Sequence, residues 1–361
     1  MMKNGTRKAA GTLCALLAAV GAACVVLRLP AGAGRQAAFA AAGFILPAGN
    51  ADGFFSEEED DNSVSSRAQS SAPAPGASSQ PSSSAGETPS GSASSGQGGS
   101  ASSGAQSAAS GKVLEMCVGN SGTQVGSMWV KNSTSKNAAL DMNQELQKAP
   151  AVKIKKNAGP QVLIYHTHTT EAFAGDTRTT EKSRSVCAVG DKIAAQLTAA
   201  GIGVVHDTTY HDYPAYDGSY DRSRVTMQND LKKYPGIQVT LDIHRDAMHR
   251  DDGTALKTTT VIDGKKAAQI MIISGCDDDG TLKYPNWEYN LRLALRFQKA
   301  LSDTYPSLAR PLDFTARKYN EDITKGSLLI EIGTDVNTLD EAEYSGELLG
   351  KVLAQVLGGL T

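Results

Sequence analysis

The stretch that decides the fold is LLIEIG, residues 328–333, together with two earlier stretches, LIYHTHTTE at 163–171 and LDIHRD at 241–246. Each begins as a short apolar run and ends in ionisable side chains. Short apolar runs of this kind are typical of strands that are buried on both faces of a sheet. In an open parallel sheet the carboxyl ends of the strands share one edge, where ligands bind. The sequence therefore predicts that these three segments meet at one edge of an α/β sheet.

The pattern around these stretches is regular from residue 159 to the end of the chain. Apolar runs of strand length alternate with segments of helical spacing, which implies βαβ units. We therefore expect an α/β domain at 159–361, with a mostly parallel, mixed sheet flanked by helices. Residues 111–158 have a mixed pattern and predict a small accessory region. The expected strands are 162–165, 202–205, 239–243, 258–262, 268–273 and 327–332, and the expected helices are 186–200, 219–233, 287–302 and 339–357.

The N-terminal segment, 1–35, has the character of a membrane anchor. Residues 9–27 carry no charge, and three basic residues precede them. A helix of that length rises about 28 Å, close to the ~30 Å hydrocarbon core of a bilayer. The basic residues favour a cytoplasmic N-terminus, so we expect a single-pass helix and an extracytoplasmic remainder. A cleaved signal peptide is the alternative.

Residues 36–110 predict a disordered linker. From residue 62 onward the segment consists mainly of Ser, Gly, Ala, Pro and Gln, with Arg67 and Glu87 as its charges. Such a segment buries too little apolar surface to offset the conformational entropy of its chain. We expect it to act as a tether between the membrane and the domain at 159–361.

Composition and missing motifs exclude several classes of function. The net charge is −3, from 35 basic and 38 acidic residues, which argues against a nucleic-acid partner. The five cysteines form no CxxC pair, so neither a zinc ribbon nor a thioredoxin-type site is indicated. No GxSxG, P-loop or GxGxxG motif is present, which leaves a serine nucleophile and nucleotide chemistry without support.

The ionisable residues at the strand ends suit a catalytic zinc site. Such a site takes three N or O ligands and keeps a fourth position for water; His168, Glu171 and His244 are the candidate ligands. Glu331 lies inside an apolar strand, where a carboxylate is costly to bury, and we expect it to be the general base. Alternation along an extended chain puts His166 on the same side as His168, so either could bind the metal. The competing interpretation is structural histidines and a buried ion pair.

Five segments carry a specific set of motifs: VLIYHTHTTEAF (162–173), HDTTYHDYPAYDGSYDRSR (206–224), LDIHRDA (241–247), KKAAQIMIISG (265–275) and LLIEIG (328–333). In these segments the sequence resembles the stage II sporulation protein P family. The resemblance implies a peptidoglycan hydrolase of sporulation that acts in engulfment, in the space between the membranes of the sporulating cell. It implies N-acetylmuramoyl-L-alanine amidase activity, with endopeptidase activity on cross-links also attributed to the family, and stage II sporulation proteins D and M as partners.

The domain is also similar to the zinc-dependent amidases, and this implies particular roles for site residues. By position, His168 and His244 match two zinc ligands and Glu331 matches the catalytic glutamate. Those amidases place their ligand glutamate at the start of the first long helix, where this chain has only Glu181 nearby. Glu171 is therefore our choice of carboxylate ligand, and Glu181 is the alternative.

Arg245 follows His244 directly and completes the set of candidate catalytic residues. A guanidinium binds a carboxylate bidentately, so we expect Arg245 to pair with a carboxylate of the peptidoglycan stem peptide.

The favoured hypothesis is thus a membrane-tethered zinc amidase. The alternative from another class is a wall-binding scaffold that recruits a lytic transglycosylase and has little catalysis of its own. A metal-dependent peptidase acting on proteins is a third interpretation with the same chemistry.

Overall fold

The computed structural model of the chain describes residues 111–361, apart from the side chains of residues 137 and 138. The membrane anchor expected at 1–35 and the linker expected at 36–110 therefore lie outside the described residues. Within residues 111–361, none of the helices combines the length and the apolar character needed to cross a bilayer.

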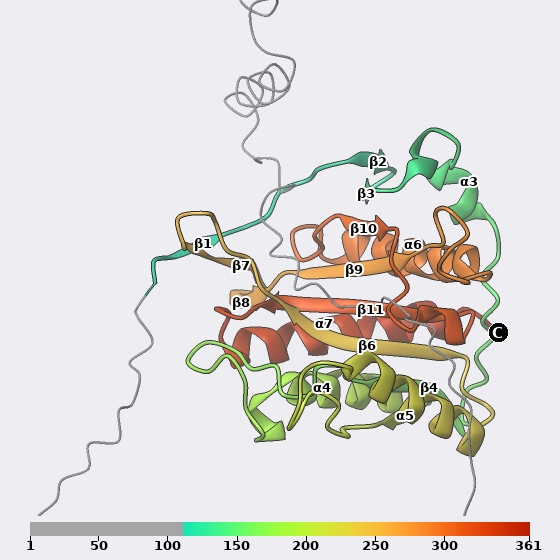
Figure 1. Cartoon of the computed structure of the whole chain (residues 1–361). Helices are drawn as coiled ribbons and strands as arrows, with labels where there is room; N and C mark the ends of the chain where they lie inside the picture. The colour runs from blue at the N-terminus through green and yellow to red at the C-terminus, as the bar shows by residue number, and fades with distance from the viewer. Residues whose placement is uncertain (1–110) are drawn as a thin grey trace, which may run out of the picture. The chain divides into compact units, whose positions relative to one another are not determined.

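The centre of the fold is an eight-stranded sheet with the strand order β2-β3-β10-β9-β11-β6-β4-β5 (Figure 1). Five neighbouring pairs are parallel, and β9–β11 and β2–β3 are antiparallel. The expected mostly parallel, mixed sheet is confirmed. The strands are β2 (Thr123–Val125), β3 (Met128–Asn132), β4 (Pro160–Tyr165), β5 (Gly203–His206), β6 (Val239–Asp246), β9 (Ile270–Gly275), β10 (Leu312–Thr315) and β11 (Ser327–Thr334).

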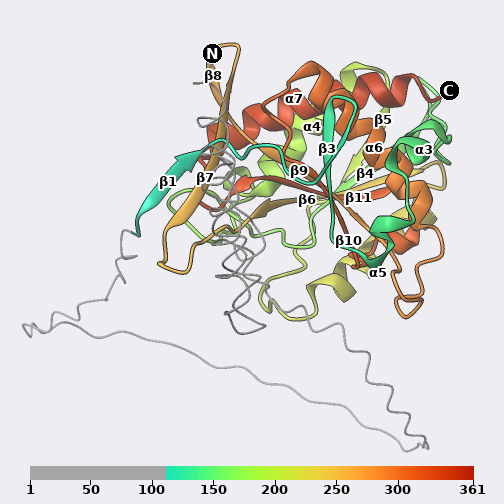
Figure 2. The same ribbon diagram turned by 90° about the horizontal axis from the view of Figure 1, so that it is seen from above.

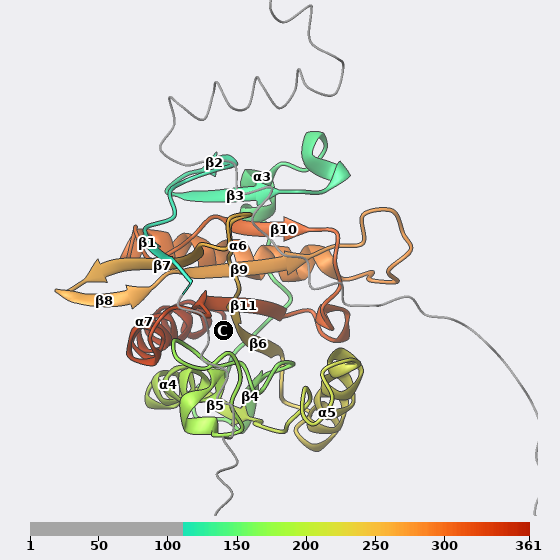
Figure 3. The ribbon, with the colours of Figure 1, turned by 60° about the vertical axis from the view of Figure 1, so that its left-hand side comes forward.

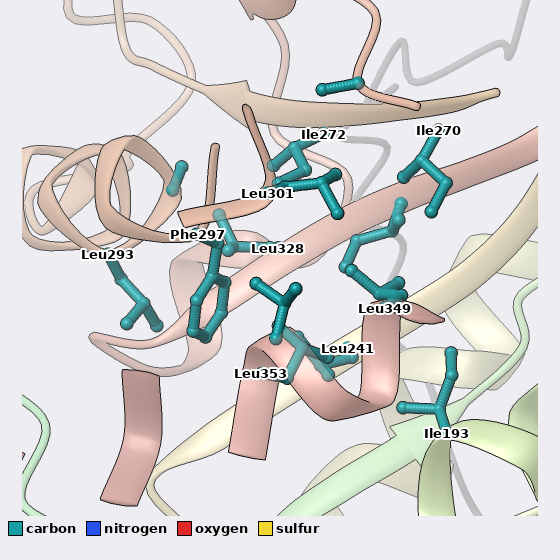
Figure 4. Packing of buried hydrophobic residues seen from close by; sticks show 14 of the residues in the cluster. Ile193, Leu241, Ile270, Ile272, Leu293, Phe297, Leu301, Leu328, Leu349 and Leu353 are labelled. Carbon is teal, nitrogen blue, oxygen red and sulfur yellow. The ribbon is translucent and has the colours of Figure 1, made fainter. Parts of the chain in front are cut away.

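Helices cover the sheet unequally on its two faces. One face packs against α4, α6 and α7, where the main apolar core lies; Figure 4 shows side chains from the strands and helices meeting there. The other face packs against α5 in a smaller apolar cluster, and Figure 3 shows α5 across the sheet from α4 and α7. The helices are α3 (Met142–Gln147), α4 (Val186–Ala199), α5 (Ser219–Lys233), α6 (Trp287–Thr304) and α7 (Leu339–Gly358), with 3₁₀ turns η2 (Ser135–Ala138), η3 (Lys182–Arg184) and η4 (Glu321–Ile323).

Residues 111–158 contribute strands to two sheets. β3 extends the central sheet by pairing in parallel with β10. β1 (Val113–Met116) pairs in parallel with β7 (Ala255–Ile262), and β8 (Lys265–Ala268) closes this second, three-stranded sheet, which can be followed in Figure 2. The β7–β8 hairpin turns at Asp263 and Gly264, which both have positive φ, the backbone conformation that an Asp-Gly hairpin turn adopts.

The arrangement of β6, β11 and β9 determines where the site lies. β11 pairs in parallel with β6, so Glu331 lies directly beside His244. On its other side β11 runs antiparallel to β9, which places Met271 beside Glu331. The register of β11 shifts after Glu331, where Gly333 has a φ of 69° and a Cβ would lie 2.8 Å from Asn337. Glycine is the residue that adopts this conformation without steric cost.

Candidate active site

Four of the expected site residues meet at the carboxyl edge of the sheet. His168 and Glu171 lie in the turn that follows β4, while His244 and Glu331 lie near the ends of β6 and β11. The rings of His168 and His244 are 5.2 Å apart and nearly perpendicular, and Oε2 of Glu171 is 3.6 Å from Nδ1 of His244. The two histidines and Glu171 are buried, so their charges interact with little screening.

Glu171 is held as an anion at this edge. Its Oε2 accepts a hydrogen bond of 3.0 Å from the backbone N–H of Arg245. Burial opposes ionisation, but the positive neighbours His244 and Arg245 outweigh it and hold the pKa of Glu171 at about 2. A carboxylate in this state is an acceptor and a potential metal ligand.

His244 lies between two carboxylates. Its Nε2 is 2.9 Å from Oδ1 of Asp242, without the angle of a hydrogen bond, and its Nδ1 faces Glu171. Burial alone would lower the pKa of His244, but Asp242 and Glu171 raise it well above the usual value. Asp242 is itself fixed, because it accepts hydrogen bonds from the backbone N–H and the hydroxyl of Thr167 at 2.8 and 2.6 Å.

His168, unlike His244, favours the neutral form of its ring. Burial lowers its pKa to about 4, against the attraction of the Glu171 carboxylate, so the ring is neutral at pH 7. Its Nε2 is 3.2 Å from the hydroxyl of Tyr216, and its Nδ1 has no hydrogen-bond partner. Buried polar atoms without a partner are uncommon in folded proteins, and such an atom suits a ligand-binding role.

Glu331 is the carboxyl group with the raised proton affinity. Burial, followed by the negative charge of Asp246, raises the pKa of Glu331 to about 8, against the positive His244. Its Oε2 lacks a hydrogen-bond partner. Arg310 pairs with Asp246 at 2.7 Å, and both side chains are largely buried beside the site.

The ring of His166 is engaged by partners other than His168, Glu171 and His244. Its Nδ1–H donates to the carbonyl of Ile243 at 2.8 Å, and its Nε2 lies 2.9 Å from Nε2 of His206. His206 in turn contacts Asp191 at 2.8 Å. Both ring nitrogens of His166 are thus engaged, and burial, followed by the neighbouring His206, lowers its pKa to about 3.

The side chains of Arg245 and Glu181 also bind groups other than the four site residues. The guanidinium of Arg245 donates to the carbonyls of Ala172 and Thr177 at 3.0 and 3.1 Å, so it fastens the loop that follows Glu171. Glu181 is exposed, and its contact is with Arg184 at 3.7 Å. Of the two candidate carboxylate ligands, the structure brings Glu171 to His244.

Several residues that shape the site are not among those predicted from the sequence. Asp242 and Asp246 were detectable, because each lies two residues from His244 in the same strand and therefore shares its face. The others, Asp212, Tyr216 and Arg310, lie in loops, and no local pattern marks them.

The donor set fits a metal ion in its chemistry. Among residues 111–361, no three His, Cys, Asp or Glu side chains are drawn together in a ligating arrangement. However, neutral His168 offers an unpartnered Nδ1, Glu171 is an anion, and His244 faces both from a neighbouring strand. Imidazole nitrogen and carboxylate oxygen are the donors of catalytic zinc sites, and the buried proton of His244 would leave on binding.

The fold and the site together define a class of protein: a mixed α/β protein with imidazoles and carboxylates at the edge where such sheets bind ligands. The sequence profile of the stage II sporulation protein P family matches residues 98–354. The chain therefore belongs to the stage II sporulation protein P family. Stage II sporulation protein P of Bacillus subtilis (strain 168) is 29% identical over 213 residues, which are 54% of this chain and 50% of that protein. The chain thus spans about half the length of this curated relative.

Several solved structures are similar to part of the chain. The N-acetylmuramoyl-L-alanine amidase AmiC2 of Nostoc punctiforme has a TM-score of 0.34 at 13% identity, over 55% of this chain and 96% of that one. The CwlD amidase of Clostridioides difficile, solved with the GerS lipoprotein, has a TM-score of 0.34 at 12% identity, over 55% of this chain and 99% of that one. A metallo-carboxypeptidase of Burkholderia cenocepacia has a TM-score of 0.33 at 9% identity, over 64% of this chain and 71% of that one. Similarity at this level does not bear on the function of this chain.

Proposed function

We propose that the chain is a peptidoglycan hydrolase of sporulation that cleaves the amide bond between N-acetylmuramic acid and L-alanine. Membership of the stage II sporulation protein P family supports this proposal. The observation that carries it is the placement of Glu331: a buried carboxyl group with an unpartnered oxygen lies directly beside His244, at the edge shared with His168 and Glu171. Hydrolysis requires such a proton acceptor beside an electrophilic centre.

His168, Glu171 and His244 are the residues that would hold zinc in this proposal. When bound, zinc lowers the pKa of a water molecule toward ~7 and polarises the carbonyl group that is attacked. Asp242 lies 2.9 Å from the other ring nitrogen of His244, the side from which carboxylates orient metal-binding imidazoles.

Glu331 has the proton-transfer role. It accepts the proton of the attacking water and returns it to the leaving amine of the L-alanine residue. Burial, followed by Asp246, raises the pKa of this carboxyl group to about 8 in the metal-free chain, and a divalent cation bound nearby would favour the carboxylate form that accepts the proton. The Asp246 carboxylate contributes to that pKa and is held in place by Arg310.

We also propose the cellular setting implied by the family resemblance. An N-terminal helix anchors the chain in the membrane, a flexible linker spans to the wall, and the site acts on peptidoglycan outside the cytoplasm. Stage II sporulation proteins D and M are the proposed partners, and stem-peptide cross-links are a further proposed substrate. A flexible tether raises the local concentration of the site at a substrate that cannot diffuse.

The test is digestion of purified sacculi by the full-length chain, with bound metal quantified and products identified by mass. We expect one zinc per chain, loss of activity with a chelator, and release of free stem peptides. Glu331→Gln should lower the rate by about 10²–10⁴-fold with an unchanged unfolding midpoint. Full activity of Glu331→Gln would contradict the assignment.

The scaffold hypothesis has its own outcome in the same assay. Wall binding without soluble fragments or new amino termini, in the presence of saturating zinc, would favour a scaffold over a hydrolase. Fragments cut between stem peptides would instead shift the proposal to an endopeptidase.

A further inference from the structure

Arg178 lies beside the candidate active site, in the loop that follows Glu171. Its backbone forms an antiparallel bridge directly opposite Glu171. Side chains that lie opposite each other in an antiparallel pair share one face, with their Cβ atoms about 4.5–5.5 Å apart. Arg178 therefore extends from the same face as the carboxylate that lies 3.6 Å from His244. The loop thus brings a guanidinium to the edge of the site.

Packing on an aromatic ring orders this guanidinium. Its central carbon lies 4.2 Å from the centre of the Tyr216 ring. Tyr216 in turn stacks on His168, with 4.6 Å between the ring centres and 11° between the planes. An aromatic ring attracts a cation over its face, so the stack holds Arg178 in place before a ligand binds. Two stacking distances separate the guanidinium from His168.

Asp212 occupies only one end of the guanidinium. Nη1 of Arg178 donates to Oδ2 of Asp212 at 2.9 Å and to the hydroxyl of Thr170 at 3.2 Å. Within residues 111–361, Nε and Nη2 of Arg178 make no hydrogen bond. These two nitrogens form one edge of the planar fork, and a carboxylate binds such an edge bidentately. The Arg178 side chain is 34% exposed and that of Asp212 is completely buried, so the cation alone can reach a ligand.

The same edge of Arg245 is already occupied. Its Nε and Nη2 donate to the carbonyls of Ala172 and Thr177, and the residue is only 8% exposed. Because Thr177 directly precedes Arg178, these contacts also support the segment that carries Arg178. The two arginines therefore differ in role: the buried one fastens the loop, and the exposed one keeps a pair of donors for a ligand.

The proposed substrate carries a carboxylate at a matching distance. In peptidoglycan the residue after L-alanine is D-glutamate linked onward through its γ-carboxyl group, so its α-carboxylate is free unless the cell amidates it. One peptide unit and its two flanking bonds separate that carboxylate from the nitrogen of the cleaved amide bond, a span of about 6 Å. The separation of Arg178 from His168 across one aromatic ring is of the same order.

We propose that Arg178 forms a carboxylate-binding subsite, in which its Nε–Nη2 edge recognises the α-carboxylate of the stem-peptide residue after L-alanine. The inference rests on the proposed function, because peptidoglycan is the substrate in that proposal. Arg178 contacts the substrate away from the cleaved bond, so it determines specificity and takes no part in proton transfer. An amidated residue offers no negative charge and only one acceptor oxygen, so the subsite favours the free acid.

The test compares two substrates that differ in this one group, N-acetylmuramoyl-L-alanyl-D-glutamate and N-acetylmuramoyl-L-alanyl-D-isoglutamine. The full-length chain is used with saturating zinc, and the measured quantity is the ratio of kcat/KM for the acid to kcat/KM for the amide. Hydrogen bonds to a charged group change such a ratio by about 10–100-fold, and we expect a value in this range for the unmodified chain. Cleavage of both substrates with a ratio near one would overturn the proposal.

Three variants assign the preference to the guanidinium. Arg178→Gln removes the charge, while Arg178→Lys keeps an ion pair with Asp212 but lacks the second donor edge. Both should bring the ratio close to one. Arg184→Gln is the matched control, because this exposed arginine pairs with Asp176 and Glu181 instead, and its ratio should stay high.

The ratio also distinguishes recognition from a structural role. If Arg178 only supported the stack, its variants would slow both substrates alike and leave the ratio high, which would contradict the subsite. A fall of the ratio in Arg184→Gln to the value of the Arg178 variants would indicate a general effect of positive charge and would also contradict it.

Binding of the cleaved dipeptides separates this inference from the proposed function. L-alanyl-D-glutamate and L-alanyl-D-isoglutamine are titrated calorimetrically into the same full-length chain with zinc. Tighter binding of the acid that disappears in Arg178→Gln supports the subsite even if neither muramyl substrate is cleaved, in which case the hydrolase proposal fails alone. Cleavage without preference for the acid retains the proposed function and overturns the subsite. Equal binding of the two dipeptides, or no binding of either, in a chain that cleaves neither substrate overturns both.

Discussion

At the scale of single residues, two glutamates of the same site differ widely in pKa. Glu171 and Glu331 are both buried carboxyl groups, yet their pKa values are about 2 and about 8. Burial raises the pKa of both groups, but at Glu171 the positive His244 and Arg245 outweigh burial, whereas at Glu331 the negative charge of Asp246 adds to it. Carboxyl groups with such separated affinities can divide the tasks of holding a cation and transferring a proton.

The two candidate carboxylate ligands provide a matched pair of variants. Glu171→Gln should abolish tight zinc binding, because it removes the anion beside His244. Glu181→Gln should leave zinc binding unchanged, because the Glu181 side chain is exposed and pairs with the exposed Arg184. Metal content after dialysis against a weak chelator measures this. Retention of zinc by Glu171→Gln together with its loss in Glu181→Gln would reverse the assignment.

Arg245 gives a second prediction at this scale. Its guanidinium bridges two backbone carbonyls of the loop after Glu171, which the single ammonium group of lysine cannot reproduce. Arg245→Lys should therefore lower the free energy of unfolding by about 1–3 kcal/mol. Urea unfolding measures this change. If Arg245 acted only on the stem peptide, the variant would raise KM and leave the stability unaltered.

The sequence could place His168, His244 and Glu331 at one edge, because an apolar run followed by an ionisable residue is a local pattern. It could not separate His166 from His168. The partners of His166 lie 77 and 40 residues away, in Ile243 and His206. Alternation assumes a straight strand, whereas β4 ends at Tyr165 and the chain turns immediately afterwards.

At the scale of secondary structure, α4 and α7 pack closely against one another. Gly346 makes it possible: a Cβ at this position would lie 2.9 Å from the carbonyl oxygen of Val189. Gly350, one turn later, lies equally close to α4 through Gln196. Two glycines four residues apart share one face of a helix, so this approach was readable in the sequence.

Substitution of these glycines tests the contact. Gly346→Ala gains about 1 kcal/mol of helix propensity, but it must displace the backbone of α4, and overpacking typically costs about 1–3 kcal/mol. We therefore expect a lower unfolding midpoint. Gly358→Ala is the control, because its Cβ would meet only the flexible end of Lys156 at 3.4 Å. Equal midpoints for the two variants would show that α4 can give way.

Strands and helices of the main domain were predictable because periodicity is a property of short segments. The orientation of β9 was not: it runs antiparallel to β11 and parallel to β10, and only the completed sheet decides this. The pairing of β1 with β7 was equally hidden, since it joins Val113–Met116 to a strand more than a hundred residues later.

At the scale of the whole molecule, Glu321 ties distant parts of the fold together. Its carboxyl group accepts hydrogen bonds from the backbone of Gly275 and Leu329 at 2.7 and 3.3 Å, and from the hydroxyl of Tyr284 at 3.1 Å. Burial nevertheless raises the pKa of Glu321 to about 8 from the usual 4.5. The folded chain thus holds a proton at neutral pH that the unfolded chain releases.

This proton makes stability depend on pH. Between pH 4.5 and pH 8 the unfolded chain binds fewer protons at Glu321, so the free energy of unfolding falls as the pH rises, by up to about 1.4 kcal/mol per pH unit. Glu321→Gln removes this dependence. We expect the stability of the unmodified chain relative to Glu321→Gln to be greater at pH 5 than at pH 8, as measured by urea unfolding at each pH. A constant difference would show that Glu321 is ionised in the fold.

The position of β11 has a consequence for the order in which the molecule is assembled. β11 is the last strand of the described chain, yet it lies between β6 and β9 in the middle of the sheet. During synthesis the two halves of the sheet therefore have no shared strand until residues 327–334 have emerged. Glu331 arrives with that same strand, so joining the sheet and completing the site are a single late event. A nascent chain that stops before β11 has the two histidines but no proton acceptor beside them.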